Sequence, residues 1–525
     1  MADGKSKYIH DLTANEYVMS CDGTPARVIS IRRDMQKTYS LIQRTKHRNI
    51  TTALIDNNRC FSSVHGRMEL NCSLTHPVNL TLFTKPVIER SFKHNHVMVR
   101  WIEVNEIVTP DGRSIRIPKY HNKTFTLTEE GQNDALNFKT TALRNATFIV
   151  HYTLQVRDLC HLDAQTRSRS KLCVKPILTG NGTLSHFLTG QYHLNTTAVQ
   201  TMAWLIGLWI GDGTTVRPEI SVDSLDTHLM DDLIELCKVW NIYPSYNDGP
   251  IPLRAKHVKL YYGKKPSNRK YYHNCKTNNP FWKAILDLNF KNEEDGCKQI
   301  PDFLWNDDII IREKFLAGLI DADGYVSKNI SQSGNLQVNI QTIYHSVMKG
   351  IVDIARSLGI SATVTTKPER MEIIKGKEVH CQLTYDCALI GKTPLQNILF
   401  YCHSGHKIRN RPQTVERDPV YFAFDDSIRG LNHVYFIEVE NTKTILLGNK
   451  MSANTCTDNC NHEQRQANRE NNQKQCLALN SAQDAMLGIK TAAIDVNHVT
   501  WFLIHERSNE NSIFKTRTQT KITSL

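Results

Sequence analysis

An internal repeat constrains this chain more than any other feature of its sequence. Residues 205–213 read LIGLWIGDG and residues 316–324 read LAGLIDADG, so the two segments align without a gap. Both are apolar, both carry small residues four positions apart, and both end in Asp-Gly. Small residues at that spacing lie on one face of a helix and let two backbones approach closely. The repeat therefore predicts two helices packed on each other, with Asp212 and Asp323 emerging where they converge.

The similarity continues beyond these segments. Residues 230–242 parallel residues 348–360 as two amphipathic helices of equal length, and short β-like stretches accompany each copy. A lysine recurs at comparable distances: Lys298 lies 298 − 212 = 86 positions after the first aspartate, and Lys407 lies 407 − 323 = 84 positions after the second. The order helix, strands, helix, strands thus occurs twice. We predict a pseudo-two-fold α+β domain of the form αββαββα, repeated twice, within one chain.

A pseudo-two-fold body suits duplex DNA, because the two strands are themselves related by local two-fold axes. Two carboxylates near such an axis can each hold a hard divalent cation and share it with a phosphate, and Mg²⁺ prefers few carboxylates plus phosphate oxygens. Lys298 and Lys407 would then act on the attacking water or on charge that develops at the phosphate. The plainer alternative is that the small residues pack two core helices and Asp212 and Asp323 merely end them.

A basic segment follows the first helix pair. From residue 254 to residue 272 it alternates basic and apolar residues, as a half-exposed strand would. A two-stranded ribbon fits the major groove, where basic side chains read base edges or neutralise phosphates. A solvated basic hairpin is the plainer alternative. The candidate DNA contacts are Arg254, Lys256, His257, Lys259, Lys264, Lys265, Arg269 and Lys270.

Composition agrees with a nucleic-acid partner and limits the alternatives. The chain has 525 residues, too many for one core, and carries a formal charge of +12, which suggests a polyanionic partner. No run of eighteen apolar residues occurs, so we expect no membrane span, and the start lacks the apolar segment of a secretory signal. The 14 cysteines are scattered, which suits reduced thiols in the cytosol or nucleus.

Residues 315–325, FLAGLIDADGY, form the complete motif of the LAGLIDADG homing endonucleases. The chain resembles that family, most closely its fungal HO-type mating-type switching members, up to about position 455. The resemblance implies a monomer that acts as a pseudo-dimer and cuts both strands of double-stranded DNA across the minor groove. It also implies a long asymmetric recognition site, short 3′ overhangs and two Mg²⁺ ions. The implied setting is the nucleus, with a role in mating-type switching by gene conversion or in homing.

The resemblance also assigns roles to individual residues. In that family the second aspartate of each motif holds the metal, which transfers to Asp212 and Asp323. The symmetric lysines would be Lys298 and Lys407. Asp223 and Thr342 occupy matching strand positions and are further catalytic candidates.

The flanks of the repeat resemble a Hint (intein splicing) domain. We therefore expect a mostly-β Hint-like domain into which the α+β endonuclease domain is inserted. An insertion in the amino-terminal part is expected to add DNA contacts at Arg90, Lys93 and Arg100. The expected boundaries are 1–176 for the amino-terminal Hint-like part, 177–414 for the LAGLIDADG domain, 415–455 for the closing strands and 456–525 for a degenerate tail.

Protein splicing is predicted to be absent. His76 matches the histidine that assists the first acyl shift, and Asn454-Thr455 sits where an intein ends. Splicing also needs a Cys, Ser or Thr at the start of the domain, whereas this chain opens at Met1. Ala453 stands where a penultimate histidine is usual. The Hint-like domain is expected to serve as a scaffold.

The tail carries part of a zinc-finger-like pattern. A structural zinc site needs four good ligands, and the second cysteine pair is incomplete. We therefore expect no zinc and a partly disordered segment, although the remaining ligand types are Cys456, Cys460, His462 and Cys476. The altered tail leaves open a DNA-binding relic that no longer cuts. An RNA maturase and an autoprocessing protein are weaker alternatives.

Overall fold

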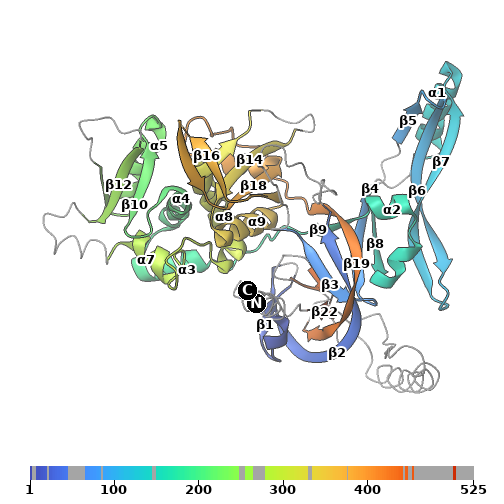
Figure 1. The fold of residues 1–525 in the computed structure, drawn as a ribbon, viewed down its shortest axis with the longest axis horizontal. Helices are drawn as coiled ribbons and strands as arrows, with labels where there is room; N and C mark the ends of the chain where they lie inside the picture. The colour runs from blue at the N-terminus through green and yellow to red at the C-terminus, as the bar shows by residue number, and fades with distance from the viewer. Residues whose placement is uncertain are drawn as a thin grey trace, which may run out of the picture.

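The computed structural model describes two bodies, one built mainly of strands and one built of helices and sheets (Figure 1). The described residues are 1–2, 7–20, 23–44, 66–83, 87–144, 149–246, 255–263, 278–328, 334–374, 376–440, 444–446, 452–454 and 501–503. In this part of the chain, no helix is both long and apolar enough to cross a membrane.

The body of helices and sheets, here called the repeat domain, has the predicted order αββαββα in its second half and the same order without the first strand in its first half. After α3 (Thr183–Tyr192), the first half contains α4 (Thr196–Asp212), β10 (Glu219–Asp223), α5 (Thr227–Val239), β11 (Ile242–Ser245), β12 (Ala255–Tyr262) and α7 (Pro280–Asp287). After a 3₁₀ turn at Asp302–Asn306, the second contains α8 (Ile309–Asp323), β13 (Gly324–Val326), β14 (Leu336–Thr342), α9 (His345–Ser357), β15 (Ser361–Lys367), β18 (Thr384–Gly391) and α10 (Thr393–Phe400). A hairpin of β16 (Arg370–Ile374) and β17 (Lys377–Cys381) interrupts the second half.

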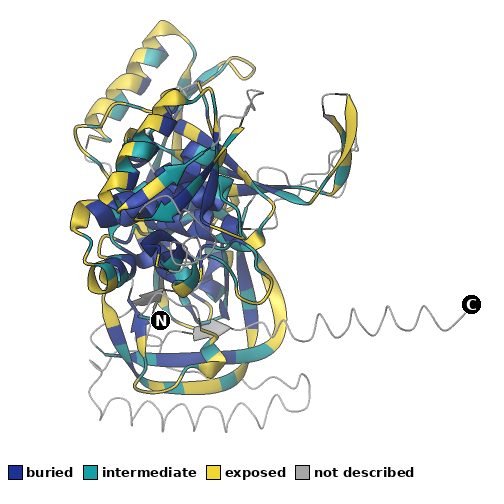
Figure 2. Ribbon diagram, turned by 90° about the vertical axis from the view of Figure 1, so that its left-hand side faces the viewer, coloured by how far each residue is buried: buried dark blue, intermediate teal, exposed yellow. Residues whose placement is uncertain are grey.

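The sheets of the two halves have the same topology. The first has the order β10-β12-β11, and the second has the order β13-β14-β18-β15, with all neighbours antiparallel. A single bridge between Gly213 and Ile220 stands where β13 pairs with β14 in the second half. One apolar core unites both halves, and buried residues gather at its centre in Figure 2, where this domain faces the viewer. The mixed α and β architecture is thus confirmed.

The second body, here called the β body, is an eight-stranded sheet with the main order β1-β2-β19-β9-β4-β8. Strand β2 pairs with β19 along nearly its full length (Figure 1), so residues before and after the repeat domain form one sheet. The remaining two strands, β3 and β22, pair with β2 and β19. The bounds are β1 (Tyr17–Met19), β2 (Pro25–Gln43), β3 (Glu69–Ser73), β4 (Pro77–Phe83), β8 (Ile149–Gln155), β9 (Lys171–Val174), β19 (Val420–Val439) and β22 (Trp501–Leu503).

A smaller unit projects from the β body between β4 and β8. Three antiparallel strands and a helix pack on a small core of Val97, Val99 and Ala135. Thr128 caps the helix by accepting a hydrogen bond from Gly131 N–H. The elements are β5 (Val87–Ser91), β6 (His96–Val108), β7 (Ser114–Thr126) and α1 (Glu129–Thr141). Short helical segments at Ile9–Asp11, Val156–His161 and Ala164–Arg169 and a hairpin of β20 (Thr444–Leu446) and β21 (Ser452–Asn454) complete the described elements.

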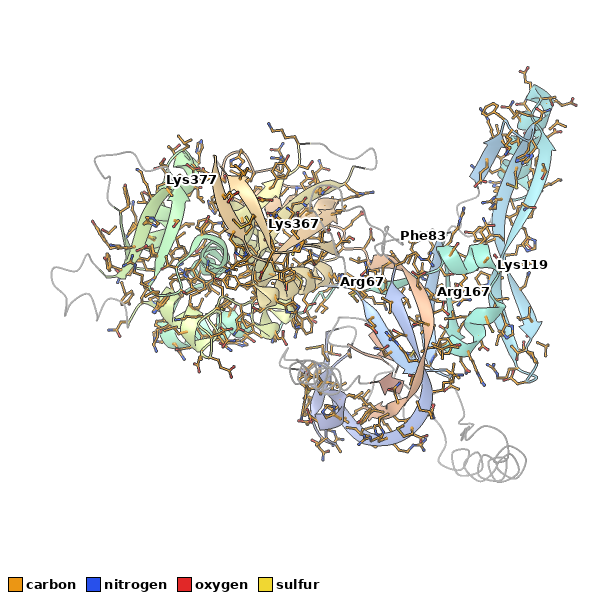
Figure 3. The ribbon with its side chains drawn as sticks, in the orientation of Figure 1. Arg67, Phe83, Lys119, Arg167, Lys367 and Lys377 are labelled. Carbon is orange, nitrogen blue, oxygen red and sulfur yellow. The ribbon has the colours of Figure 1, made fainter. Side chains whose placement is uncertain are left out.

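Buried arginines join the two bodies. Arg356 of α9 donates to Gly66 O (2.6 Å), and Arg312 of α8 donates to Ile177 O (2.8 Å). Arg67, which follows Gly66 in the chain, lies on the side of the β body that faces the repeat domain (Figure 3). Because buried guanidinium groups are costly without acceptors, these bonds hold the segment before β3 and the segment before α3 against the repeat domain.

Candidate active site

The contact between α4 and α8 positions the candidate site. A Cβ added at Gly207 would lie 2.0 Å from Phe315 O, and one added at Gly318 would lie 1.9 Å from Trp204 O. These contacts are reciprocal, because Gly207 aligns with Gly318 and Trp204 aligns with Phe315 in the repeat. Only glycine permits so close an approach of two helix backbones. The predicted packing of the two helices is therefore present.

The two aspartates end these helices on the same side. Asp212 is the last residue of α4, and Asp323 is the last residue of α8. A Cβ added at Gly211 would lie 2.3 Å from Ala322 Cβ and 3.0 Å from Asp323 Oδ2. The Asp323 carboxylate therefore lies against the last turn of α4, beside Asp212. The two aspartates therefore stand at neighbouring helix ends, where α4 and α8 converge.

Both candidate lysines reach the ends of the same helices. Lys298 Nζ donates to Gly211 O (2.7 Å), 5.5 Å from the centre of the Trp209 ring. Lys407 Nζ donates to Ile320 O (2.8 Å) and Asp321 O (2.7 Å). The last carbonyls of a helix lack intrahelical partners and carry partial negative charge, so an ammonium group suits them. Only 6% of Lys298 and 7% of Lys407 is exposed, so both are built into the site.

The electrostatics of the site couple these groups. Burial, and then the negative charge of Asp323, raises the pKa of Asp212 to about 6. Burial lowers the pKa of Lys298 to about 8, although both aspartates oppose this change. Burial of the carboxyl group also raises the pKa of Asp323, although the residue as a whole is exposed. Two carboxylates whose ionisation is mutually unfavourable are expected to bind a cation between or beside them.

The donor set fits a hard divalent cation. Within the described ranges, no group of three or more His, Cys, Asp or Glu side chains could hold a metal ion. Two carboxylates alone leave most of the coordination shell of Mg²⁺ to waters and phosphate oxygens, which is how this ion is usually bound. Asp212 and Asp323 therefore suit a cation that is shared with a phosphate backbone.

A third aspartate of the motif has a different role. Asp321 is buried and accepts hydrogen bonds from Trp204 Nε1 (2.8 Å), His403 N–H (2.8 Å) and Ser404 N–H (3.0 Å). Burial raises the pKa of Asp321 even though these donors favour the carboxylate. The sequence analysis did not single out this residue. The signal that could have identified Asp321 is that it replaces an apolar residue, Ile210, of the first copy.

Asp223 and Thr342 are not equivalent in the two sheets. Gly213 pairs with Ile220 and Gly324 pairs with Ile340, which aligns Thr342 with Val222 rather than with Asp223. The predicted match is therefore offset by one residue, and a one-residue offset places the side chains on opposite faces of a strand. Both side chains bond the turn that follows, since Asp223 Oδ1 accepts from Leu225 N–H and Thr342 Oγ1 accepts from Tyr344 N–H.

The described candidate DNA contacts of the first half lie on β12, and they are divided between its two faces. His257 and Lys259 lie opposite Ser221 and Glu219 of β10, on the outer face. Lys256 lies on the other face, 5.1 Å from the centre of the Tyr246 ring. Five further predicted DNA contacts fall outside the described residues: Arg254, Lys264, Lys265, Arg269 and Lys270.

The second half carries a polar counterpart that the sequence analysis missed. Asn339 and Gln341 of β14 donate to the two oxygens of Asp386 on β18, at 3.1 and 3.2 Å. Lys367 Nζ of β15, labelled in Figure 3, lies 3.7 Å from the same carboxylate. The β14 strand of this face carries amide side chains, whereas β12 of the first half carries basic side chains.

The predicted contacts of the projecting unit have different environments. Arg90 and Lys93 are exposed at the β5–β6 turn, beside Phe92, which is 80% exposed. Arg100 instead pairs with Glu89 at 3.0 Å across β5 and β6. It is therefore less available to DNA than the other two.

The residues expected from a splicing site lie in the β body. His76 is buried just before β4, and desolvation lowers its pKa to about 3. Asn454 ends β21, which contacts β4, so the backbones of these two segments are close. The predicted zinc-ligand types, Cys456, Cys460, His462 and Cys476, fall outside the described residues.

Comparisons with known proteins identify the family. Residues 191–291 and 299–416 match the family model described as homing endonuclease. The homothallic switching endonuclease of Saccharomyces cerevisiae (strain ATCC 204508 / S288c) is 47% identical over 481 residues, which cover 91% of this chain and 82% of that protein. The chain therefore belongs to the homing endonuclease family of site-specific DNA endonucleases. Within it, the chain is a homologue of the homothallic switching endonuclease.

More distant matches cover different shares of the chain. A V-type proton ATPase catalytic subunit from Candida tropicalis is 23% identical over 499 residues, which cover 88% of this chain but 43% of that protein. Among solved structures, a crystal structure of I-DmoI in complex with DNA and Ca is 15% identical, with a TM-score of 0.22. That match covers 41% of this chain and 94% of the I-DmoI chain.

Proposed function

We propose that this protein hydrolyses one phosphodiester bond in each strand of double-stranded DNA at a long asymmetric site. It acts as a monomer whose two halves serve as a pseudo-dimer. The single observation that carries the proposal is the convergence of Asp212 and Asp323 at the ends of two close-packed helices, each flanked by a buried lysine. The match to the homothallic switching endonuclease supports the same function.

In this proposal Asp212 and Asp323 hold Mg²⁺, with two ions expected. When bound, Mg²⁺ lowers the pKa of the attacking water and stabilises charge on the reacting oxygens. Lys298 and Lys407 donate to helix carbonyls, so each ammonium group is held at the edge of the carboxylate pair. There it offsets negative charge that develops at the phosphate. Attack on both strands across the minor groove would leave short 3′ overhangs.

The remaining surfaces would hold the DNA. His257 and Lys259 on the outer face of β12 are the described candidates in the first half. Arg90 and Lys93 of the projecting unit would add auxiliary contacts, since both are exposed basic residues. Phosphate contacts of this kind fix the position of a protein on the duplex, whereas base contacts give sequence specificity.

We further infer that residues 1–176 and 415–455 form a Hint-like scaffold around an endonuclease domain at 177–414. The pairing of β2 with β19 across the inserted domain supports this division. Splicing is proposed to be absent, because Ala453 replaces the usual penultimate histidine. The proposed role is a chromosomal break in the nucleus that starts mating-type switching by gene conversion, or homing.

The test is cleavage of a randomised duplex library by the full chain with Mg²⁺, followed by sequencing of the new ends. We expect double-strand breaks with short 3′ overhangs at one long sequence, lost on chelation by EDTA and in Asp323→Asn. Asp287→Asn, a substitution in α7 at a carboxylate paired with Lys283, is the matched control and should cut normally. Selective binding without nicking or cutting would instead establish the DNA-binding relic, and unchanged cutting by Asp323→Asn would refute the site.

A further inference from the structure

Residues 402–407, here called the clamp loop, follow α10 and end at Lys407. Two backbone N–H groups of this loop, at His403 and Ser404, donate to the buried carboxylate of Asp321. Lys407 follows directly and donates back to the carbonyls of Ile320 and Asp321. The clamp loop and the last turn of α8 are therefore bonded in both directions.

The clamp loop also crosses to the first half of the repeat domain. His403 Nδ1 donates to Asp232 of α5 at 2.7 Å, and its ring lies 4.5 Å from that of Trp204 on α4. Ser404 Oγ donates to Asp226, the residue that caps the start of α5. A Cβ at Gly405 would lie 3.1 Å from His228 Cδ2, so the loop is in contact with the first turn of α5.

The corresponding segment before Lys298 is held differently. Ile210 stands where the second half has Asp321, so this position offers no carboxylate to collect the loop's N–H groups. A contact to the other half is made by Ser346 Oγ of α9, which donates to Lys298 O at 3.2 Å. The Lys298 ammonium group itself reaches the carbonyl of Gly211. The loop that carries Lys407 is thus held by carboxylates of both halves. Lys298 instead lies on a backbone bridge to Lys291 and contacts a hydroxyl and an aromatic ring, with no carboxylate among these partners.

We propose that the clamp loop positions Lys407 and thereby sets the rate at which one particular strand of the duplex is cut, with Asp232, Asp226 and Asp321 as positioning residues. The inference rests on the proposed function of the lysines. A lysine side chain has a flexible four-carbon stem, and its ammonium group is placed only as well as its backbone is anchored. Because displacement of about 1 Å can cost on the order of a hundredfold in rate, loosening the anchor affects the strand that this lysine serves.

The experiment uses the full chain on its selected duplex, with a different fluorophore on each strand, under single-turnover conditions. Lys407→Met first identifies the dependent strand by slowing it selectively. Asp232→Asn and His403→Ala should then slow that same strand about tenfold and leave the other within about twofold. Ser346→Ala is the matched variant at the other loop and should slow only the opposite strand.

Two further variants separate positioning from general damage. His403→Asn keeps a donor near the Nδ1 position and should restore most of the lost rate. The double variant Asp232→Asn with His403→Ala should be no slower than His403→Ala alone, because without the imidazole ring residue 232 has no hydrogen bond to His403 left to weaken. Asp232 and His403 have side chains that are 50% and 25% exposed, so their substitution should leave the unfolding temperature nearly unchanged.

The outcomes distinguish failure of the clamp loop from failure of the proposed role of Lys407. If Lys407→Met slows one strand but Asp232→Asn and His403→Ala slow both strands equally, or neither, the clamp is wrong and the lysine assignment stands. If Lys407→Met leaves both strands unchanged, the proposed role of the lysine fails, and the clamp fails with it.

Discussion

The two halves of the repeat domain have one backbone plan and two ways of holding their lysines. Gly207 and Gly318 make reciprocal contacts, and the sheets share their strand order. The second half adds a carboxylate at Asp321, where the first half has an apolar Ile210. Symmetry therefore fixes where the acidic groups meet, whereas the loops that deliver Lys298 and Lys407 differ between the halves. A symmetric centre with unequal supports suits an asymmetric DNA site.

The largest expected effect tests the symmetric part of this comparison. Asp212→Asn and Asp323→Asn should each slow cleavage of both strands on the order of a thousandfold, because the two carboxylates share one charged centre. Cleavage is measured strand by strand on the labelled duplex, with binding followed by gel shift. An Asp212→Asn protein that still nicks one strand at the original rate would show that the halves work independently.

The next effect concerns the helix contact itself. Gly207→Ala and Gly318→Ala should each lower the free energy of unfolding by about 3 kcal/mol, because either methyl group would meet a backbone carbonyl of the other helix. Urea denaturation of the full chain measures the change. Gly190→Ala is the control, since nothing lies within 4 Å of its Cβ position in α3. Very unequal losses at Gly207 and Gly318 would contradict the reciprocity of the contact.

The sequence predicted what the two copies share. The spacing of small residues indicated the helix contact, and the similar separations from the aspartates indicated the lysines that reach Gly211 O and Ile320 O. A repeat is informative because each copy constrains the other copy. The same alignment misjudged Asp223 and Thr342, since an offset of one residue in the strand leaves the periodic pattern of the segment almost unchanged.

The features that differ between copies were not predictable in this way. The bond between His403 and Asp232 joins residues 171 positions apart, so no local pattern of the sequence points to it. Likewise, β2 and β19 pair across the whole inserted domain, a contact that local patterns do not encode. Asp386 accepts hydrogen bonds from Asn339 and Gln341 of β14, a strand without charged residues, so this face lacked the basic signature that marked β12.

A comparable or smaller effect is expected on the stability of the chain when the two aspartates hold no metal. The pKa of Asp212 is about 6 in the folded chain and 3.8 as its ordinary value, so the folded state binds more protons between these values. The contribution of this carboxyl group to stability therefore falls as pH rises from about 4 to about 6, and stays low above that. In EDTA, Asp212→Asn should stabilise the chain by about 3 kcal/mol at pH 7 and by about 1.5 kcal/mol at pH 5.

The matched variant is Asp323→Asn, which should give a smaller gain at the same pH, because Asp323 as a whole residue is more exposed than Asp212. Thermal unfolding at pH 5 and pH 7 measures both. Destabilisation by Asp212→Asn in EDTA at pH 7 would mean that the carboxylate is satisfied without a cation, which would weaken the case for a metal there.

The smallest effect compares the outer faces of the two sheets. Lys259 lies opposite Glu219, whose carboxylate is already paired with Arg217 at 2.7 Å. The positive charge of Lys259 therefore remains available to a phosphate. Lys367 lies 3.7 Å from Asp386, which partly neutralises it. If both sheets face the duplex, Lys259→Ala should lower the slope of log affinity against log salt by about one, and Lys367→Ala by clearly less. Equal slopes for the two variants would mean that Asp386 does not offset the charge of Lys367 in the complex. An unchanged slope for Lys259→Ala would mean that the DNA does not bind to the outer face of β12.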